Sequence, residues 1–255
     1  MDISSPQRVD DILDERAFTL PGDIPGILWT PSHASRDAPV PLILMGHPGD
    51  LGRMRPRLVA RALRAAADGF ATATIELPGA GRRTPLPVVD GARSDLRRHL
   101  AAGDPVPADV VDRLILPLVD EAVPEWQQTI DALLTRDEIA GRVGFSGGVI
   151  AIAVRLAAVD PRIRCAGLFA GSYVPAATLA DAEHVDIPLH VLLQWDDLGN
   201  DRQQALDLFD AFASNEKTLE ANMGGHTGVP AHAGEAAAAF FVRHLAAEAQ
   251  SIGTA

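Results

Sequence analysis

The stretch RVGFSGGVIAIAV, residues 142–154, decides the fold. Arg142–Phe145 is predicted to be a strand, and the apolar run Val149–Val159 predicts a helix directly after it. Between them, Gly144–Gly148 match Gly-x-Ser-x-Gly, the pattern of a sharp strand-to-helix turn that presents a serine nucleophile. Such a turn would place Ser146 in a strained backbone conformation at the N-terminus of the helix, where the dipole favours a developing anion. The alternative is a glycine-rich turn whose serine only caps the helix.

Outward from this stretch, short apolar runs that predict strands alternate with runs of helical periodicity. Further strands are predicted at Val40–Met45, Phe70–Leu77, Ile163–Ala170, Pro188–Gln194 and Lys217–Asn222, after two entry strands at Arg16–Leu20 and Gly26–Thr30. Helices are predicted at Arg55–Ala67, with its arginines on the face opposite its apolar residues, and at Ala108–Leu134, Arg202–Ala213 and Pro230–Ala249. Proline lacks an N–H donor, so Pro117 and Pro124 are expected to interrupt the helix Ala108–Leu134. The alternation predicts an α/β fold with a single doubly wound, mostly parallel sheet, in one domain over residues 1–255.

Residues 82–116 break this alternation with prolines, glycines and arginines, and hold one predicted short helix near Ala92–Leu100. Because the segment follows the carboxyl end of a strand, where ligand sites of α/β sheets lie, it is predicted to form a small helical lid. Leu96 and Val106 are then expected to contact the substrate. The basic side chains of this segment form either a solvated face or a contact for an anionic substrate; they are Arg82, Arg83, Arg93, Arg97 and Arg98.

Composition excludes several classes of protein. The chain has 255 residues, with 22 Lys and Arg against 34 Asp and Glu, a net charge of −12. Such an acidic surface is repelled by nucleic acid and by anionic membranes, so neither is an expected partner. No apolar run approaches the roughly 18 residues of a membrane span, and the N-terminus has no signal-peptide pattern, so a cytoplasmic protein is expected. The single cysteine, Cys165, excludes an internal disulfide and is predicted to be a buried, inert thiol. No spacing of ligands predicts a metal, and no nucleotide motif predicts a cofactor.

A serine nucleophile needs a histidine base and a carboxylate that orients it. His226 lies between glycines in a loop that follows the last predicted strand, which gives its ring room to reach a substrate; the alternative is an ordinary exposed loop histidine. Asp196 and Asp197 follow the preceding strand, and either could be the acid. The chain order serine, aspartate, histidine is the order found in α/β-hydrolases.

An oxyanion hole needs two N–H donors that are fixed before the reaction. Gly147, directly after the serine, supplies the first. The second is expected in the loop after the strand Val40–Met45, where Pro48 has no N–H, so Gly49 is the candidate and His47 the fallback. The side chain of His47 is predicted either to bind the substrate or to brace this loop through hydrogen bonds.

Three segments carry a family resemblance: Val40–Gly49, residues 68–81 (DGFATATIELPGAG) and residues 224–230 (GGHTGVP). Together with the serine motif, they resemble the α/β-hydrolase superfamily and, within it, the dienelactone-hydrolase-like serine esterases. In such proteins the acid commonly follows its strand in a Gly-x-x-Asp pattern; Gln194 takes the glycine position here, so the resemblance favours Asp197. Dienelactone hydrolases themselves use a cysteine nucleophile where this chain has Ser146, so their lactone substrate is not carried over.

The expected function is hydrolysis of carboxylic esters of small to medium organic molecules through Ser146, His226 and Asp197, without cofactor or metal. The same three residues could also serve a thioesterase, a lactonase or a hydrolase of carbon–carbon bonds next to a ketone. A different class of function, a ligand-binding protein that keeps the fold and has lost turnover, is the remaining alternative.

Overall fold

The computed structural model describes residues 1–246. Their strands form one ten-stranded sheet in the order β1-β3-β4-β6-β5-β7-β8-β9-β10, with β2 paired to β3. The strands are β1 (Asp2–Ile3), β2 (Gln7–Asp10), β3 (Leu13–Leu20), β4 (Ile24–Pro31), β5 (Val40–Gly46), β6 (Ala71–Ile75), β7 (Ile139–Gly147), β8 (Ile163–Phe169), β9 (Leu189–Gln194) and β10 (Lys217–Asn222). From β6 to β10 all neighbours are parallel, whereas β3 and β4 join by antiparallel pairing. The predicted mostly parallel α/β sheet is confirmed.

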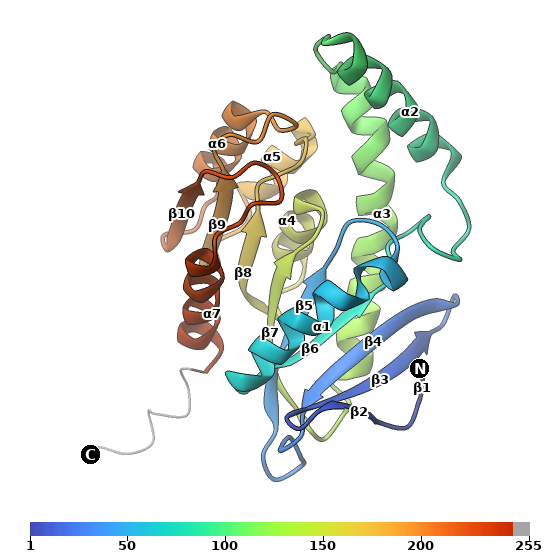
Figure 1. Cartoon of the computed structure of the whole chain (residues 1–255), viewed down its shortest axis with the longest axis vertical. Coiled ribbons are helices and arrows are strands. Elements are labelled where there is room, and N and C mark those ends of the chain that lie inside the picture. Colours follow the sequence, from blue (N-terminus) through green and yellow to red (C-terminus); the bar gives the residue numbers. More distant parts are fainter. Residues whose placement is uncertain (247–255) are drawn as a thin grey trace.

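Helices cover both faces of the sheet (Figure 1). They are α1 (Leu51–Ala67), α2 (Pro87–Ala102), α3 (Ala108–Leu133), α4 (Ile150–Val159), α5 (Ala176–Ala182), α6 (Arg202–Ala211) and α7 (Ala231–Leu245). α1 and α7 lie on one face, and α3 to α6 lie on the other. The larger apolar core lies under α3 and α4, and a second core lies under α1 and α7. Cys165 is buried in the second core, and burial raises the pKa of its thiol to about 12, in line with an inert side chain.

The long helix α3 differs from the prediction, because it continues through Pro117 and Pro124. Each proline removes one backbone hydrogen bond, to the carbonyl four residues earlier. Those carbonyls belong to Arg113 and Asp120, whose side chains reach solvent, so water can take the place of the missing donors. The opposite face of α3 is buried along its whole length, and this packing keeps the helix continuous through both sites. The predicted last helix begins one residue later than expected, and its residues 247–249 lie outside the described part.

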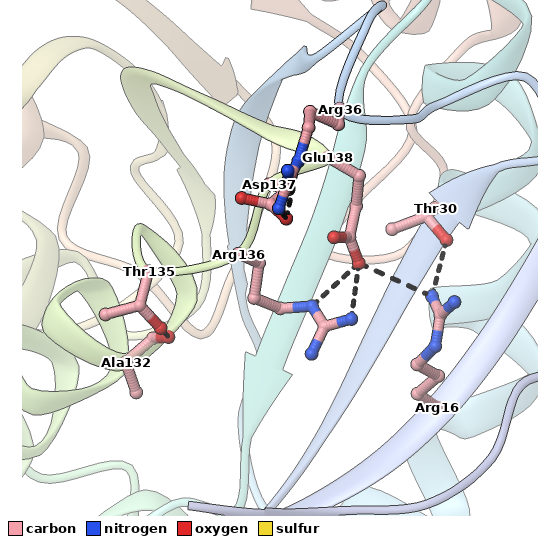
Figure 2. A network of polar contacts seen from close by, with 8 residues as sticks. All are labelled: Arg16, Thr30, Arg36, Ala132, Thr135, Arg136, Asp137 and Glu138. Atoms are coloured by element: carbon pink, nitrogen blue, oxygen red, sulfur yellow. Dashed lines mark hydrogen bonds and ion pairs between the residues drawn. The ribbon is translucent and has the colours of Figure 1, made fainter.

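A polar network ties the connection between α3 and β7 to the antiparallel end of the sheet (Figure 2). Glu138 accepts a hydrogen bond from Arg136 Nε at 2.7 Å and forms an ion pair with Arg16 at 3.8 Å. Arg16 also donates to Thr30 Oγ1 at 3.1 Å, and Arg36 pairs with Asp137 beside it. These contacts fix the start of β7, the strand that carries the candidate nucleophile.

Candidate active site

Ser146 lies near the end of β7, opposite Met45 of β5 and Gly167 of β8. The structure corrects the predicted elbow in two respects. Ser146 keeps the negative φ of a strand residue, and Gly147 (φ 74°) and Gly148 (φ 80°) take the left-handed conformation in its place. The helix α4 begins only at Ile150, so Ser146 is not at its N-terminus. The two glycines absorb the turn because a backbone without a Cβ adopts positive φ at little cost.

The ends of β5 and β7 approach so closely that only glycine fits between them. A Cβ on Gly46 would lie 2.9 Å from the carbonyl oxygen of Gly147, and a Cβ on Gly148 would lie 2.8 Å from the Cα of Gly46. Both distances are far inside van der Waals contact. This contact places the loop after β5, which supplies His47 and Gly49, directly beside the turn after Ser146.

His226 and Asp197 form the pair that the sequence predicted. The Nδ1 of His226 lies 2.7 Å from Oδ2 of Asp197, and the carboxylate side chain is only 4% exposed, whereas the imidazole is 57% exposed. The second oxygen of Asp197 accepts the N–H of Gly199 at 3.1 Å, and the ring of Phe169 packs edge-on against His226. A buried carboxylate thus holds the ring by Nδ1 and leaves Nε2 for a substrate or nucleophile.

Asp196, the other candidate acid, holds the histidine loop by its backbone. Its carboxylate accepts the N–H groups of Gly224 and Gly225, each at 2.9 Å. These two hydrogen bonds lower the pKa of Asp196, with the larger contribution from Gly225. The adjacent aspartates therefore have different contacts: Asp197 touches the ring of His226, and Asp196 fixes the backbone that carries it.

A cavity of about 700 Å³ opens on the face of the sheet between α1 and α7. Ser146, Gly147 and His226 line it, together with His47. The remaining lining is largely apolar and includes Ile43, Met45, Leu58, Phe169 and Phe241. A largely apolar cavity with a few polar groups is typical of sites for small organic molecules.

Sequence reasoning missed Arg61, which contacts Ser146 directly. Its Nη2 donates to Ser146 Oγ at 2.9 Å and to the Ser146 carbonyl at 3.1 Å, and its Nη1 lies 3.4 Å from the carbonyl of Gly46. Burial, and to a lesser extent the charge of Arg57, lowers the pKa of Arg61 to about 10, so that it remains a cation at neutral pH. Within residues 1–246, Ser146 Oγ has no hydrogen bond to His226. The arginines of α1 were visible in the sequence, but the helical period alone put them on a solvent face.

Not all of the other predicted site residues line this cavity. Gly49 has a positive φ of 91° and does not line it, whereas the fallback residue His47 does. The His47 ring is buried, with Nε2 3.0 Å from the carbonyl of Ile75, a contact that braces the loop, and burial lowers its pKa. Leu96 on α2 and Val106 after it do not line the cavity, because α2 packs against α3, beyond the sheet (Figure 1). The predicted lid over residues 82–116 stays a prediction.

Two other kinds of feature are absent from the described residues. No group of three or more His, Cys, Asp or Glu side chains is arranged to hold a metal ion. Among the helices of residues 1–246, none is both long and apolar enough to cross a membrane.

Comparisons with known proteins identify the fold. No protein-family model and no curated protein matches the sequence. Among solved structures, the chain is similar to a cold-adapted esterase from an Arctic intertidal metagenomic library, with a TM-score of 0.75 and 24% identity over 96% of this chain and 100% of the other. An acetyl xylan esterase from Paenibacillus sp. R4 matches with a TM-score of 0.66 and 15% identity, over 95% of this chain and 89% of the other.

A third similar structure is a protein from Klebsiella pneumoniae subsp. pneumoniae assigned as a dienelactone hydrolase. Its TM-score is 0.66 at 14% identity, over 92% of this chain and 99% of the other. The chain therefore has the α/β-hydrolase fold, as the sequence predicted.

Proposed function

We propose that the protein is a serine hydrolase of carboxylic esters. One observation carries this proposal: His226, joined to the buried Asp197 at 2.7 Å, borders the same cavity as Ser146. Three groups that are distant in the sequence thus converge on one site in the chain order of α/β-hydrolases. Structural neighbours that are esterases support the same chemistry.

In the proposed mechanism Ser146 Oγ attacks the ester carbonyl while His226 Nε2 takes its proton. Asp197 keeps Nδ1 protonated and stabilises the imidazolium. The alcohol leaves with the proton from His226, and water then releases the acid from Ser146 by the same steps in reverse. The tetrahedral oxyanion is held by the N–H of Gly147 and by a second N–H from the loop after β5, from Gly49 or from His47.

The contact between Arg61 and Ser146 is compatible with this mechanism. A hydroxyl has one donor and two acceptor positions, and Arg61 occupies only an acceptor position. The Ser146 proton is therefore free to turn toward His226. A positive charge 2.9 Å from Oγ also favours the alkoxide character that develops during attack.

The direct test is a panel of esters that vary in acyl and alcohol group, with thioesters and lactones included, assayed on wild type and Ser146→Ala. We expect wild type to turn over esters and Ser146→Ala to lose about 10³-fold or more in kcat, with an unchanged melting temperature. Residual activity above a few per cent in the variant would exclude Ser146 as the nucleophile.

A second candidate is a ligand-binding protein without turnover. The observation that favours it is the strand conformation of Ser146, which has no hydrogen bond to His226 in the described residues. A fluorophosphonate probe separates the two functions, because it labels only an activated serine. Labelling of wild type that is absent in Ser146→Ala supports the hydrolase, and absence of labelling in both supports the ligand-binding protein.

The predicted lid is part of the proposal and has its own test. If residues 82–116 close over the site, Leu96→Ala and Val106→Ala will change the preferred acyl chain length more than they change the melting temperature. Unchanged ester selectivity in both folded variants would reject the lid.

A further inference from the structure

One face of α1 presents a row of arginines to the cavity. Arg57, Arg61 and Arg64 all line it. They stand four and three residues apart, a spacing that places side chains on one face of a helix, about 6 Å and 4.5 Å apart along its axis. A cationic row inside a cavity is unexpected in a chain with a net charge of −12.

None of these three arginines has a carboxylate partner in residues 1–246. Arg57 and Arg64 are exposed, but Arg61 is half-buried, and most buried or half-buried arginines of the chain have such a partner. Arg83, for example, pairs with Glu125, and Arg155 pairs with Asp181 at 2.6 Å. The contacts of Arg61 are all to neutral oxygens of Gly46 and Ser146. Asp68 is the one carboxylate that lines the described cavity, and it forms no ion pair with any of the three. Arg61 is the desolvated member of the row. A desolvated cation without a counter-ion is unfavourable, so an anion that reaches Arg61 would be bound favourably.

A second, independent feature of the cavity also indicates a polar ligand. Thr72 on β6 is 1% exposed and lines the cavity, and its Oγ1 has no hydrogen-bond partner in the described residues. Its neighbour on the same face, Thr74, is satisfied by the carbonyl of Met45 at 2.7 Å. Buried hydroxyls are nearly always hydrogen-bonded in folded proteins. An oxygen-bearing ligand in the cavity would supply the missing partner.

We infer that the cavity face of α1 is an anion site that selects esters with a carboxylate on the acyl half, the monoesters of dicarboxylic acids. The inference rests on the proposed function for the role of Ser146. Arg61 contacts the atom that would carry the acyl group, so the group it binds stays within reach in both the substrate complex and the acyl-enzyme. The flat fork of a guanidinium matches a carboxylate in two parallel hydrogen bonds. Apolar neighbours such as Ile43 and Leu58 accommodate the methylene chain between the two acid groups.

The kinetic test compares matched pairs of substrates. Monoethyl glutarate, adipate and suberate are assayed against ethyl pentanoate, hexanoate and octanoate, with ethanol release as the readout, in wild type and in Arg61→Gln. The matched control is Arg53→Gln, an α1 arginine that does not line the cavity. We expect wild type and the control to prefer the anionic ester, and Arg61→Gln to lose at least tenfold in the ratio of kcat/KM between the two substrates. A merely structural defect would lower both values together and leave the ratio unchanged, and that result would overturn the inference.

A binding test separates failure of this inference from failure of the proposed function. Titration calorimetry measures glutarate and adipate dianions on wild type, Arg61→Gln, Arg57→Gln and Arg53→Gln, and needs no turnover. Binding that weakens tenfold or more in Arg61→Gln and persists in Arg53→Gln supports the anion site even if no ester is hydrolysed. Equal affinity in wild type and Arg61→Gln, or no binding at millimolar concentration, overturns it. Inorganic phosphate serves as the second probe: tighter binding than either dicarboxylate would overturn the assignment to carboxylates.

Discussion

Half-buried arginines have opposite surroundings in two regions of this molecule. In the network of Figure 2, Arg16 and Arg136 are about one-fifth exposed and meet the carboxylate of Glu138. In the cavity, Arg61 is also half-buried but meets only the neutral oxygens of Ser146 and Gly46. Burial is therefore not what distinguishes a structural arginine from a ligand-binding one. The difference is whether the protein itself supplies the counter-charge.

This comparison predicts that substitutions in one region change stability and that substitutions in the other change catalysis or binding. We call the network of Figure 2 the closed network, because its arginines meet a carboxylate of the protein. Its groups should contribute to the free energy of unfolding and should not affect catalysis. Groups around the cavity should contribute to catalysis or binding and leave stability nearly unchanged. The following predictions test that separation, from the largest expected effect to the smallest.

The largest effect is expected at the carboxylate that faces the cavity histidine. Asp197→Asn keeps the shape of the side chain but removes the charge that orients and stabilises His226. We expect kcat to fall by about 10³–10⁴-fold with little change in melting temperature. Asp196→Asn, the adjacent control, should lose less than about tenfold, because it touches only the loop backbone. Steady-state kinetics of the two variants check this, and the reverse ranking would move the catalytic acid to Asp196.

The comparison can be sharpened by giving a cavity arginine the partner that it lacks. A Cβ on Gly234 of α7 would lie 3.6 Å from Arg64 Nη1, so Gly234→Asp would place a carboxylate beside this guanidinium. One like charge a few ångströms from a bound anion costs about 1 kcal/mol or more, so adipate should bind about tenfold more weakly. The melting temperature should rise, because the helix loses a glycine and gains an ion pair. Gly234→Asn is the neutral control, and equal affinities in the two variants would contradict the prediction.

The reverse experiment removes a partner from the closed network. Glu138→Gln leaves Arg16 and Arg136 without their carboxylate. We expect the free energy of unfolding to fall by about 1–2 kcal/mol, the range for a charged hydrogen bond that is partly exposed to solvent. Denaturant titration measures this loss, and the selectivity for anionic esters should not change. A changed selectivity with unchanged stability would break the distinction between the two regions.

The sequence predicted the α/β sheet because that signal is local. The central parallel strands, such as β6 and β9, are buried on both faces and have apolar sequences. The edge strand β10 is more polar and half-exposed, and it still begins and ends at the predicted residues. The pair of His226 with Asp197 was also predictable, because each follows a neighbouring strand at the same edge of the sheet. Periodicity and the order of the strands suffice to bring His226 near the two adjacent aspartates, whereas the choice of Asp197 over Asp196 came from the family resemblance.

The remaining features depend on contacts between elements, which no local pattern contains. Whether α1 turns its arginines to solvent or to a cavity depends on the position of α7, and the helical period is the same in both cases. The turn after Ser146 depends on the approach of Gly46, the last residue of β5, to Gly148, which directly follows β7. The continuity of α3 through Pro117 likewise depends on the core that packs against its buried face.

The smallest expected effect concerns Asp196, an exposed carboxylate that accepts two backbone hydrogen bonds. Asp196 accepts the N–H groups of Gly225 and Gly224, and these hydrogen bonds lower its pKa. The folded-state pKa of Asp196 thus lies below the unfolded value of about 3.9. The carboxylate therefore stabilises the loop fully above that pH, and this stabilisation is lost as the pH falls through the lowered pKa. Protection factors for the Gly224 and Gly225 amides, measured by hydrogen exchange, should therefore stay constant from pH 7 to about 4 and decrease below it. In Asp196→Asn the same amides should be less protected at pH 7 and lack this decrease. If these amides had the same protection factors in Asp196→Asn as in wild type at every pH, the carboxylate would have no part in holding the loop of His226. The charge of Asp196 would then not explain why this loop is ordered.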